Sequence, residues 1–253
     1  MTVLLTGAAG RIGSQLRQLL PEFGWTLRLL DRRPVDGGVV GDITSASDWD
    51  SAIGDGVSAI VHLAACPTEA PWPVLRRDNV EGTVQAFEAA RRHSVRRFIF
   101  ASTIHAAGFT RRESSTISAD TPVRPDTLYG VTKAFSETLG RYYSDRYGLE
   151  VACLRIAAFS ESPPVDEYHS CWFSPRDCAR LVDACLRHSD LHYAQVWGIS
   201  RNSTRWLSLD EGHAIGYEPE DDSGPGPYGD HEFLGGGYVG AEYGIDEIAA
   251  EWQ

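Results

Sequence analysis

Tyr129 and Lys133 stand four residues apart, and Lys133 is the only lysine of the chain. Residues at this spacing share one face of a helix. A phenol has an ordinary pKa of about 10, and a nearby ammonium lowers it by favouring the phenolate. Tyr129 is therefore predicted to be a general base for a substrate hydroxyl, or the acid in the reverse direction. The alternative is a surface pair without a catalytic role.

Two hydroxyl residues, Ser102 and Thr103, follow the apolar run Arg97–Ala101. If that run is a strand of a parallel sheet, they lie at its carboxyl end, where α/β proteins bind ligands. One of these hydroxyls could then hydrogen-bond the substrate oxygen beside Tyr129. We predict a catalytic set of Ser102, Thr103, Tyr129 and Lys133, with a simple cap as the alternative for the Ser–Thr pair.

A glycine pattern follows the first apolar run, Val3–Leu5. Such a pattern lets the backbone turn tightly, approach a pyrophosphate and present a helix N-terminus to it. The strand before the loop and the helix after it favour a dinucleotide site over a plain turn. The loop residues predicted to bind the cofactor are Gly7, Ala9, Gly10, Arg11, Ile12 and Gly13.

Asp31 stands at the end of the second apolar run, Thr26–Leu30. A carboxylate roughly 20 residues after a glycine loop can accept both hydrogens of a ribose diol, and it repels a 2′-phosphate. Arg32 and Arg33 follow, and an arginine here could instead accommodate that phosphate. The sequence therefore favours NAD over NADP.

Weaker signals extend the predicted cofactor site. Asp42 and Ile43 could meet the adenine edge, and the small residues after His62 leave room for a cofactor. His62 itself is equally consistent with a core histidine. The further positions predicted to line the cofactor are Arg32, Asp42, Ile43, Leu63, Ala64, Ala65, Asn79, Ala101 and Ile156.

Short apolar runs alternate with amphipathic stretches along the chain, which predicts an α/β, doubly wound parallel sheet. The predicted strands are Val3–Leu5, Thr26–Leu30, Ala59–Leu63, Arg97–Ala101, Val151–Ile156 and Ala194–Ile199. The predicted helices are Ile12–Leu20, Asp48–Ile53, Asn79–Arg92, Tyr129–Tyr147 and Pro175–Arg187. Residues 1–150 are expected to form the dinucleotide-binding core. Residues 151–253 are expected to add the remaining strands and a small substrate-binding lobe to the same structural unit.

Composition excludes several classes of protein. The net charge of −12 over 253 residues argues against a nucleic-acid partner. No apolar run is long enough to span a membrane, and no signal-peptide pattern opens the chain. Five irregularly spaced cysteines indicate reduced thiols and a cytoplasmic protein. No tight set of ligands predicts a metal site.

The motifs occur in one order along the chain: the glycine loop, Asp31, His62-Leu63-Ala64-Ala65, Asn79, the Ser102-Thr103 strand end and the Tyr129–Lys133 pair. This order resembles the extended short-chain dehydrogenase/reductase superfamily, which includes NAD-dependent epimerases and dehydratases. The resemblance implies a Rossmann-type fold. It also implies a catalytic set of Thr103, Tyr129 and Lys133, with Asn79 as a supporting polar residue. Related enzymes pair through the helix that carries the tyrosine and lysine, so a homo-oligomer is expected.

Nearly the whole chain further resembles the bacterial uronate dehydrogenases, which oxidise the anomeric carbon of a hexuronate with NAD. Carried over by position, Tyr129 takes the proton of the anomeric hydroxyl, His105 contacts a sugar hydroxyl and Tyr238 closes the pocket. The positions that the resemblance places around the substrate are Pro67, Thr103, Ile104, His105, Tyr129, Ala158, Glu167, Trp172 and Tyr238.

The departures from that family concern its substrate pocket. Ile104 stands where the family has an asparagine, and Pro67 and Ala158 stand where it has serines. The family's carboxylate-binding arginine aligns near Glu167, and only Arg201 or Arg205 could replace it from a later loop. A buried carboxylate without its arginine loses several kcal/mol. The expected substrate is therefore a neutral or amino sugar.

The leading expectation is an NAD-dependent dehydrogenase of a carbohydrate-like alcohol or lactol. One alternative is an epimerase or dehydratase that keeps its NAD and acts on a small sugar-like or natural-product substrate. The other alternative is a non-catalytic NAD(H)-binding regulator, which the intact Tyr129–Lys133 pair argues against.

Overall fold

A seven-stranded sheet runs through the molecule in the order β3-β2-β1-β4-β5-β6-β9, and each pair of neighbours is parallel. The computed structural model describes residues 1–112, 115–166, 168–226 and 231–240. The strands are β1 (Thr2–Thr6), β2 (Thr26–Asp31), β3 (Val39–Val40), β4 (Val57–His62), β5 (Arg97–Thr103), β6 (Glu150–Ile156) and β9 (Tyr193–Gly198). The predicted α/β, doubly wound Rossmann-type fold is confirmed.

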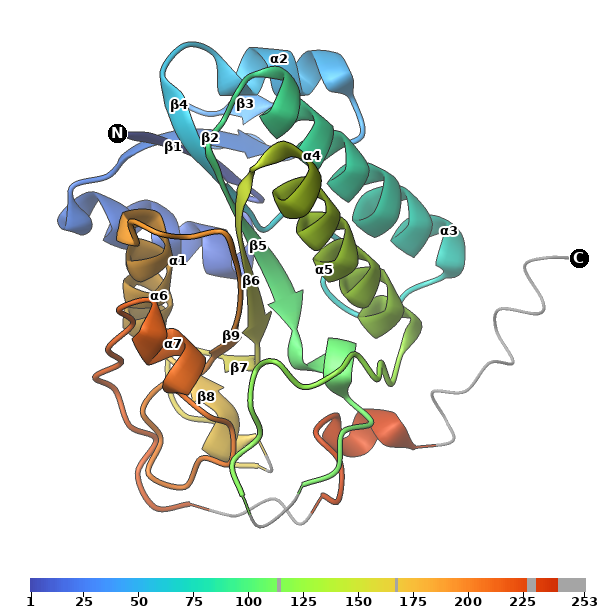
Figure 1. Ribbon diagram of the computed structural model, residues 1–253, viewed down its shortest axis with the longest axis vertical. Helices are drawn as coiled ribbons and strands as arrows, with labels where there is room; N and C mark the ends of the chain where they lie inside the picture. Colours follow the sequence, from blue (N-terminus) through green and yellow to red (C-terminus); the bar gives the residue numbers. More distant parts are fainter. Residues whose placement is uncertain (113–114, 167, 227–230, 241–253) are drawn as a thin grey trace, which may run out of the picture.

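Helices cover both faces of the sheet (Figure 1). One face carries α1 (Arg11–Leu19), α6 (Pro175–Arg187) and α7 (Asp210–Ala214). The other carries α2 (Ala46–Ile53), α4 (Gly82–Arg92) and α5 (Leu128–Tyr147), with the short α3 (Trp72–Leu75) before α4. Single turns of 3-10 helix lie at Leu20–Phe23, Ile104–Ala107, His169–Cys171 and Gly236–Val239, and a π-helical segment lies at Arg76–Glu81.

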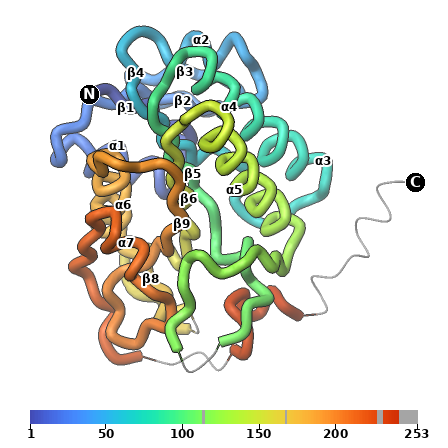
Figure 2. Tube along the Cα trace, viewed as in Figure 1, coloured from blue at the N-terminus to red at the C-terminus, as the bar shows by residue number. Residues whose placement is uncertain are grey.

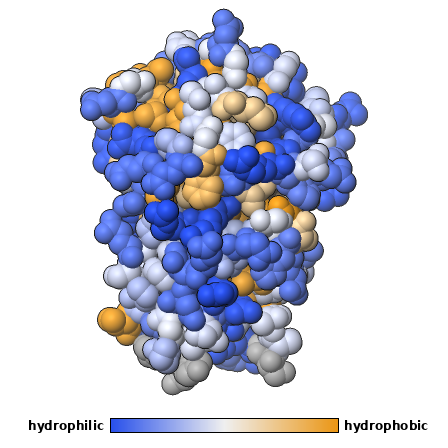
Figure 3. Space-filling view, turned by 90° about the vertical axis from the view of Figure 1, so that its left-hand side faces the viewer, coloured by the Kyte–Doolittle hydropathy of each residue, from blue (hydrophilic) through white to orange (hydrophobic). Residues whose placement is uncertain are grey.

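The sheet separates two hydrophobic clusters. Leu16 of α1 and Leu181 of α6 belong to the first, and Trp49 of α2 and Phe87 of α4 belong to the second. The outer face over α1, α6 and α7 is largely hydrophilic with small apolar patches (Figure 3). This arrangement explains the sequence pattern, because parallel strands are buried on both sides while each helix buries one stripe.

All six predicted strands and all five predicted helices are present, with differences at their ends. β3, β7 (Ala158–Phe159) and β8 (Trp172–Phe173) were not predicted, because a two-residue strand has no periodicity to detect. The helix predicted from Asn79 starts instead as the π-helical segment and becomes α-helical at Gly82.

A smaller region, named here the carboxyl-edge region, lies beyond the carboxyl ends of the strands of the large sheet. It contains the two-stranded parallel pair β7–β8 and the loops that follow β9. Figure 2 shows the segment after β5 and the last described turn running side by side there. β6 starts at residue 150 and β9 lies after it, so the large sheet continues past the predicted boundary, as expected for one structural unit. The division at that residue stays a prediction.

No helix in the described ranges is long and apolar enough to cross a membrane. The described residues also contain no group of His, Cys, Asp or Glu side chains placed to hold a metal ion.

Candidate active site

The glycine loop is shaped by close backbone approaches. Gly7 has a φ of 69°, and a Cβ atom there would lie 2.7 Å from the Ala64 nitrogen. A Cβ at Gly13 would overlap the Gly7 carbonyl oxygen, and Gly10 donates its N–H to that oxygen at 2.9 Å. The loop therefore packs tightly between Ala64 and the start of α1, as a pyrophosphate cradle requires.

The first turn of α1 begins at this loop. Gly10 is its N-cap, and no side chain caps it. The N–H groups of a helix start that lack a capping side chain are free for an anion. The surroundings that the structure describes here therefore fit a dinucleotide phosphate. Arg11 extends from this turn over the ring of Phe159 in β7, 5.9 Å from its centroid.

Asp31 lies at the end of β2 beside the loop and is buried. Its carboxylate accepts the N–H groups of Ala9 and Arg33, each at 2.8 Å. These bonds fix the carboxylate and leave further lone pairs for a ribose diol. Arg33 turns back to the Ala9 carbonyl, and Arg32 reaches Asp78 at 3.4 Å. Both arginines are thus held by the protein's own groups, which is consistent with a preference for NAD.

The predicted adenine edge is built into local structure. Asp42 accepts the N–H and the hydroxyl of Thr44 at 2.9 and 2.7 Å, and it pairs with Arg77. Ile43 packs against Gly82, because a Cβ atom added to Gly82 would lie 2.6 Å from Cδ1 of Ile43. Contact of Asp42 and Ile43 with adenine stays a prediction.

The loop after β4 is held by buried polar side chains. Thr6 accepts the N–H of Ala64 at 3.3 Å and bonds Nδ1 of His62 at 2.8 Å. Asn79 bonds both the N–H and the carbonyl of Cys66, at 2.7 and 3.1 Å, and donates to Thr132 of α5 at 3.0 Å. His62 is thus a core residue that supports the loop, and Asn79 links the loop to the helix that carries Tyr129.

The structure brings Thr103, Tyr129 and Lys133 together at the carboxyl end of β5. Thr103 is the last residue of β5, and its side chain interacts with the Tyr129 hydroxyl. Lys133 is buried, donates to the Ala101 carbonyl at 2.8 Å, and lies 5.7 Å from the centre of the Tyr129 ring. Ile156 is the register partner of Thr103 on β6.

The sequence predicts that Lys133 lowers the pKa of Tyr129 below its ordinary value. For the protein without a bound cofactor, this prediction is wrong. Burial raises the pKa of Tyr129 above its ordinary value, and the bond to Thr103 offsets only part of this. Burial also lowers the pKa of Lys133 to about 8, against the opposing effects of Cys66 and Glu137. Attraction between a phenolate and an ammonium favours the charged form of both groups. Desolvation disfavours the charge on each of them, and it is the larger effect here.

The Ser102 side chain does not point to Tyr129. Its hydroxyl donates to Oε1 of Glu137 at 2.5 Å, and the residue is buried. Successive side chains of a strand point to opposite faces, so Ser102 and Thr103 cannot both face the Tyr129 hydroxyl. A direct catalytic role for Ser102 is therefore not supported by its position.

A histidine–aspartate pair lies beside Tyr129. Nδ1 of His105 donates to Oδ2 of Asp126 at 2.9 Å, because a carboxylate can only accept. The Asp126 side chain is fully buried. The centre of the His105 ring lies 6.3 Å from the centre of the Tyr129 ring and 4.6 Å from that of the Tyr238 ring. The predicted positions of His105 and Tyr238 beside Tyr129 are thus consistent with the geometry.

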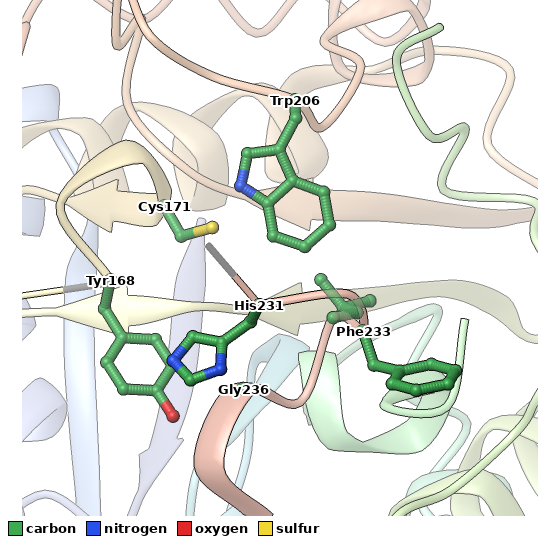
Figure 4. Close-up of a pocket in the computed structure, with 7 residues that line it drawn as sticks. Tyr168, Cys171, Trp206, His231, Phe233 and Gly236 are labelled. Atoms are coloured by element: carbon green, nitrogen blue, oxygen red, sulfur yellow. The ribbon is translucent and has the colours of Figure 1, made fainter. Parts of the chain in front are cut away.

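The segment that carries Tyr238 packs closely on this pair. A Cβ at Gly235 would overlap Oδ2 of Asp126, and the Gly235 N–H bonds the Gly108 carbonyl at 2.9 Å. The next residue, Gly236, borders a cavity between this segment and the Trp206 loop (Figure 4). The cavity measures about 10 Å³, room for a water molecule rather than a sugar. A cavity of this size is too small to be the predicted substrate pocket.

The remaining predicted substrate positions lie in different surroundings. Ala158 of β7 pairs with Trp172 of β8, and the Trp172 indole donates to the Ser160 carbonyl at 2.9 Å. Ile104 is buried in the first hydrophobic cluster, and Pro67 is exposed. Glu167 lies outside the described residues. A substrate contact of these residues stays a prediction.

Three acidic residues were not predicted at the site. Glu137 could have been found from its spacing, because it follows Lys133 by four residues on the same helix. Asp126 could have been suspected as an acid just before the Tyr129 helix. Glu69, whose Oε2 accepts the Tyr129 N–H at 2.8 Å, comes from a loop and left no pattern in the sequence.

Comparisons with known proteins match the chain to one family model and to dehydrogenases that act on sugars. The model of the NAD dependent epimerase/dehydratase family matches residues 3–163. NAD-dependent glucose-6-phosphate dehydrogenase of Haloferax volcanii is 38% identical over 249 residues, with 87% of this chain and 94% of that protein covered. L-arabinose 1-dehydrogenase (NAD(P)(+)) of the same organism is 37% identical over 251 residues, covering 87% and 97%.

A solved structure agrees with these matches. Uronate dehydrogenase from Agrobacterium tumefaciens, in a mutant form complexed with NAD, superposes with a TM-score of 0.86 at 32% identity. The superposition covers 94% of this chain and 96% of that one. The similarity therefore includes the carboxyl-edge region as well as the sheet, and the resemblance to the uronate dehydrogenases is confirmed.

Proposed function

Because the chain belongs to the NAD dependent epimerase/dehydratase family, we propose that it is an NAD-dependent dehydrogenase that oxidises the hydroxyl of a sugar-like alcohol or lactol. The expectations of an enzyme of this family and of NAD as its cofactor are confirmed. The meeting of Thr103, Tyr129 and buried Lys133 at the carboxyl end of β5 carries the proposal. A hydroxyl-oxidising site needs this combination of an oxygen-holding group, a proton acceptor and a fixed cation.

Each residue has a distinct part in the proposed reaction. Thr103 and Tyr129 hold the hydroxyl oxygen on the carbon that is oxidised, and Tyr129 removes the proton of that hydroxyl. NAD, when bound, would supply the hydride acceptor, and its positive charge would favour the phenolate form of Tyr129. Lys133, fixed by the Ala101 carbonyl, lies beside the tyrosine ring and would hold the nicotinamide ribose. His105, oriented by Asp126, would bind a second sugar hydroxyl through its Nε2.

We further propose a neutral or amino sugar as the substrate. The Glu69 carboxylate accepts the N–H of Tyr129 at the start of α5, where the helix dipole favours its negative charge. Arg201 and Arg205, which were expected to replace a missing arginine, donate to the carbonyls of Glu220 and Asn202. An anionic sugar would thus meet a carboxylate near the catalytic tyrosine. The names of the relatives cover glucose 6-phosphate, uronate and L-arabinose, which supports a sugar and includes an uncharged one.

The test is formation of NADH with a panel of sugars, followed at the nicotinamide absorption. Neutral aldoses, amino sugars, galacturonate, glucuronate and glucose 6-phosphate would be compared, each with NAD and NADP. Turnover of a neutral or amino sugar with NAD is expected. Cofactor that stays bound, with isomerised product and no net NADH, would instead favour an epimerase. NAD binding without turnover of any sugar or alcohol would leave only a regulatory role.

A charge-neutralising substitution tests the substrate class. Glu69→Gln is expected to raise kcat/KM for uronates about tenfold, because it removes a repulsive charge near Tyr129. The value for neutral sugars should stay the same. Glu22→Gln is the matched control, since Glu22 forms an exposed pair with Arg176 beyond the far end of α1. Faster turnover of uronates than of neutral sugars by the unaltered enzyme would contradict the neutral substrate.

We also propose a homo-oligomer that forms through α5. Four large apolar side chains of this helix are exposed, namely Val131, Phe135, Tyr142 and Tyr147, by 38 to 51%. Light scattering after size exclusion should show a mass above 27.8 kDa, reduced to that of one chain by Phe135→Glu. We further propose a cytoplasmic location, which is supported by the five free cysteine thiols, four of them buried.

A further inference from the structure

A buried ion pair that the proposed mechanism does not use lies behind the catalytic residues. Arg155 of β6 donates to Glu137 of α5 through Nε at 3.0 Å and Nη2 at 2.9 Å. The two side chains are 1% and 2% exposed. Ser102 donates to the same carboxylate at 2.5 Å, and Gln195 of β9 donates at 2.9 Å. Four hydrogen bonds therefore converge on one buried carboxylate.

The partners of Glu137 are neighbours of the reacting groups. Glu137 follows Lys133 by one helical turn on α5, and Ser102 precedes Thr103 on β5. The hydrogen bond between Ser102 and Glu137 thus joins the strand end that holds Thr103 to the helix that carries Lys133. A shift of either element against the other must break it.

The arginine extends the connection to a third segment. Nη1 of Arg155 donates to the carbonyls of Ala119 and Thr121, at 3.0 and 2.8 Å. Its guanidinium lies 5.6 Å from the ring centre of Trp197, whose indole donates to the Ile117 carbonyl at 2.9 Å. Three carbonyls of the segment 117–121 are therefore held from the sheet. This segment leads from the turn that carries His105 into α5.

Stability alone does not account for such a pair. Desolvation of two charges costs several kcal/mol each, and well-packed apolar residues of similar volume are often as stable. The planar guanidinium, in contrast, fixes directions in a way that apolar contacts do not.

We propose that Glu137, with Arg155 and Ser102, is a positioning residue of the active site, which sets Lys133 and Thr103 relative to each other without touching the substrate. This inference rests on the proposed dehydrogenase function. The role expected for Ser102 from the sequence is thereby changed from direct contact to support of its neighbour Thr103.

Glu137 also acts on Lys133 through its charge. Burial lowers the pKa of Lys133 to about 8, and the negative charge of Glu137 opposes that shift. The other titratable and charged groups around Lys133 are Tyr129 on its own helix, Cys66 and His62 from β4 and its loop, and Arg155 behind Glu137. Without the carboxylate, Arg155 would remain as an unpaired cation and lower the pKa of Lys133 further.

The single lysine provides a direct measurement. Labelling the protein with 15N- or 13C-lysine gives one ammonium signal, that of Lys133, whose titration is independent of turnover. Glu137→Gln is expected to move this titration to lower pH and to reduce kcat on the order of 100-fold, since misplacement of about 1 Å has such an effect. Ser102→Ala keeps the charge, so kcat should fall by a smaller factor while the Lys133 titration stays near 8.

Glu150→Gln is the matched control. Glu150 and Arg97 form a second pair of low exposure between β6 and β5, at the amino ends of the strands whose carboxyl ends carry Arg155 and Thr103. This substitution should lower the thermal midpoint but leave both kcat and the Lys133 titration unchanged. NAD affinity, measured by calorimetry, should remain within about twofold in the control.

The outcomes separate the two proposals. If the unaltered protein oxidises no sugar, the proposed function fails, while the Lys133 titrations in the unaltered protein and Glu137→Gln still test the electrostatic link. If Glu137→Gln and Ser102→Ala keep the kcat of the unaltered enzyme and the titration does not move, the ion pair is structural only and the inference is wrong. Should Glu137→Gln not fold, an unchanged kcat in Ser102→Ala overturns the positioning role.

Discussion

The glycine loop and the carboxyl-edge region are held in place by different means. At the loop, backbone meets backbone, because the Gly7 and Gly13 positions leave no room for a side chain beside Ala64 and the Gly7 carbonyl. At the carboxyl edge, buried side chains hold distant segments together, as Asp126 does for His105 and the segment around Gly235. Backbone contacts allow one arrangement, whereas side-chain contacts can change with a few substitutions. We therefore expect the glycine loop to tolerate fewer substitutions than the carboxyl-edge region.

The largest effect is expected where the two regions meet. Tyr129→Phe removes the proton acceptor and should reduce kcat about 1,000-fold, within the usual range for a general acid or base. NAD affinity should remain, because the glycine loop is untouched. Stopped-flow kinetics and calorimetry measure the two quantities. Retention of most turnover would assign the proton transfer to another residue.

An acid titration probes the region of the glycine loop. Burial lowers the pKa of His62 to about 3, with a smaller effect of the charge on Lys133. The unfolded chain therefore binds a proton below pH about 6.5 that the folded protein binds only near 3, so stability falls as pH falls through this window. The loss over the whole window is on the order of 5 kcal/mol. Urea unfolding between pH 7 and 4 should show this slope.

His62→Asn removes the titrating group and is the test variant for that slope. Its overall stability should be lower, since Thr6 changes its partner, but the dependence on pH should be flatter. An unaltered slope would show that other groups, and not His62, cause the acid sensitivity.

Alanine at Gly13 tests the steric part of the comparison. The added methyl group would overlap the Gly7 carbonyl, so we expect a loss of about 1–3 kcal/mol of stability from overpacking. NAD affinity should fall with it, because the loop and α1 must separate. Thermal unfolding with and without NAD measures both effects. A variant that binds NAD normally would mean that the backbone contact is not needed.

Alanine at Gly235 is the corresponding change at the other end. The methyl group would displace the segment from Asp126 and move Tyr238 away from His105. We expect a higher KM for the sugar, a smaller loss of stability than at Gly13, and unchanged affinity for NAD. If NAD binding weakened as much as at Gly13, the two regions would not be independent.

The sequence was sufficient for the parts that depend on local spacing. The glycine loop, the position of Asp31 and the Tyr129–Lys133 face of α5 follow from contacts within one or two elements. Ser102 shows where such reasoning fails, because its direction depends on Glu137, 35 residues away. The pKa of Tyr129 was also beyond sequence reasoning, since it depends on burial by several segments. Glu69 could not be found at all, because a loop carboxylate becomes part of the site only when the chain has folded.

The order of the strands has a consequence for how the protein is made. β1 lies inside the sheet between β2 and β4. The strands beside the glycine loop, and the Ala64 backbone that it contacts, therefore all belong to the first 64 residues. The ion pair of Glu137 needs Arg155, and its contact with Gln195 needs most of the chain. Since domains emerge from the ribosome at about 5–20 residues per second, we expect the cofactor end to acquire protection seconds before the catalytic residues are aligned. Pulse-labelled hydrogen exchange on stalled nascent chains of increasing length should show amides of β1 and β4 protected before those of α5.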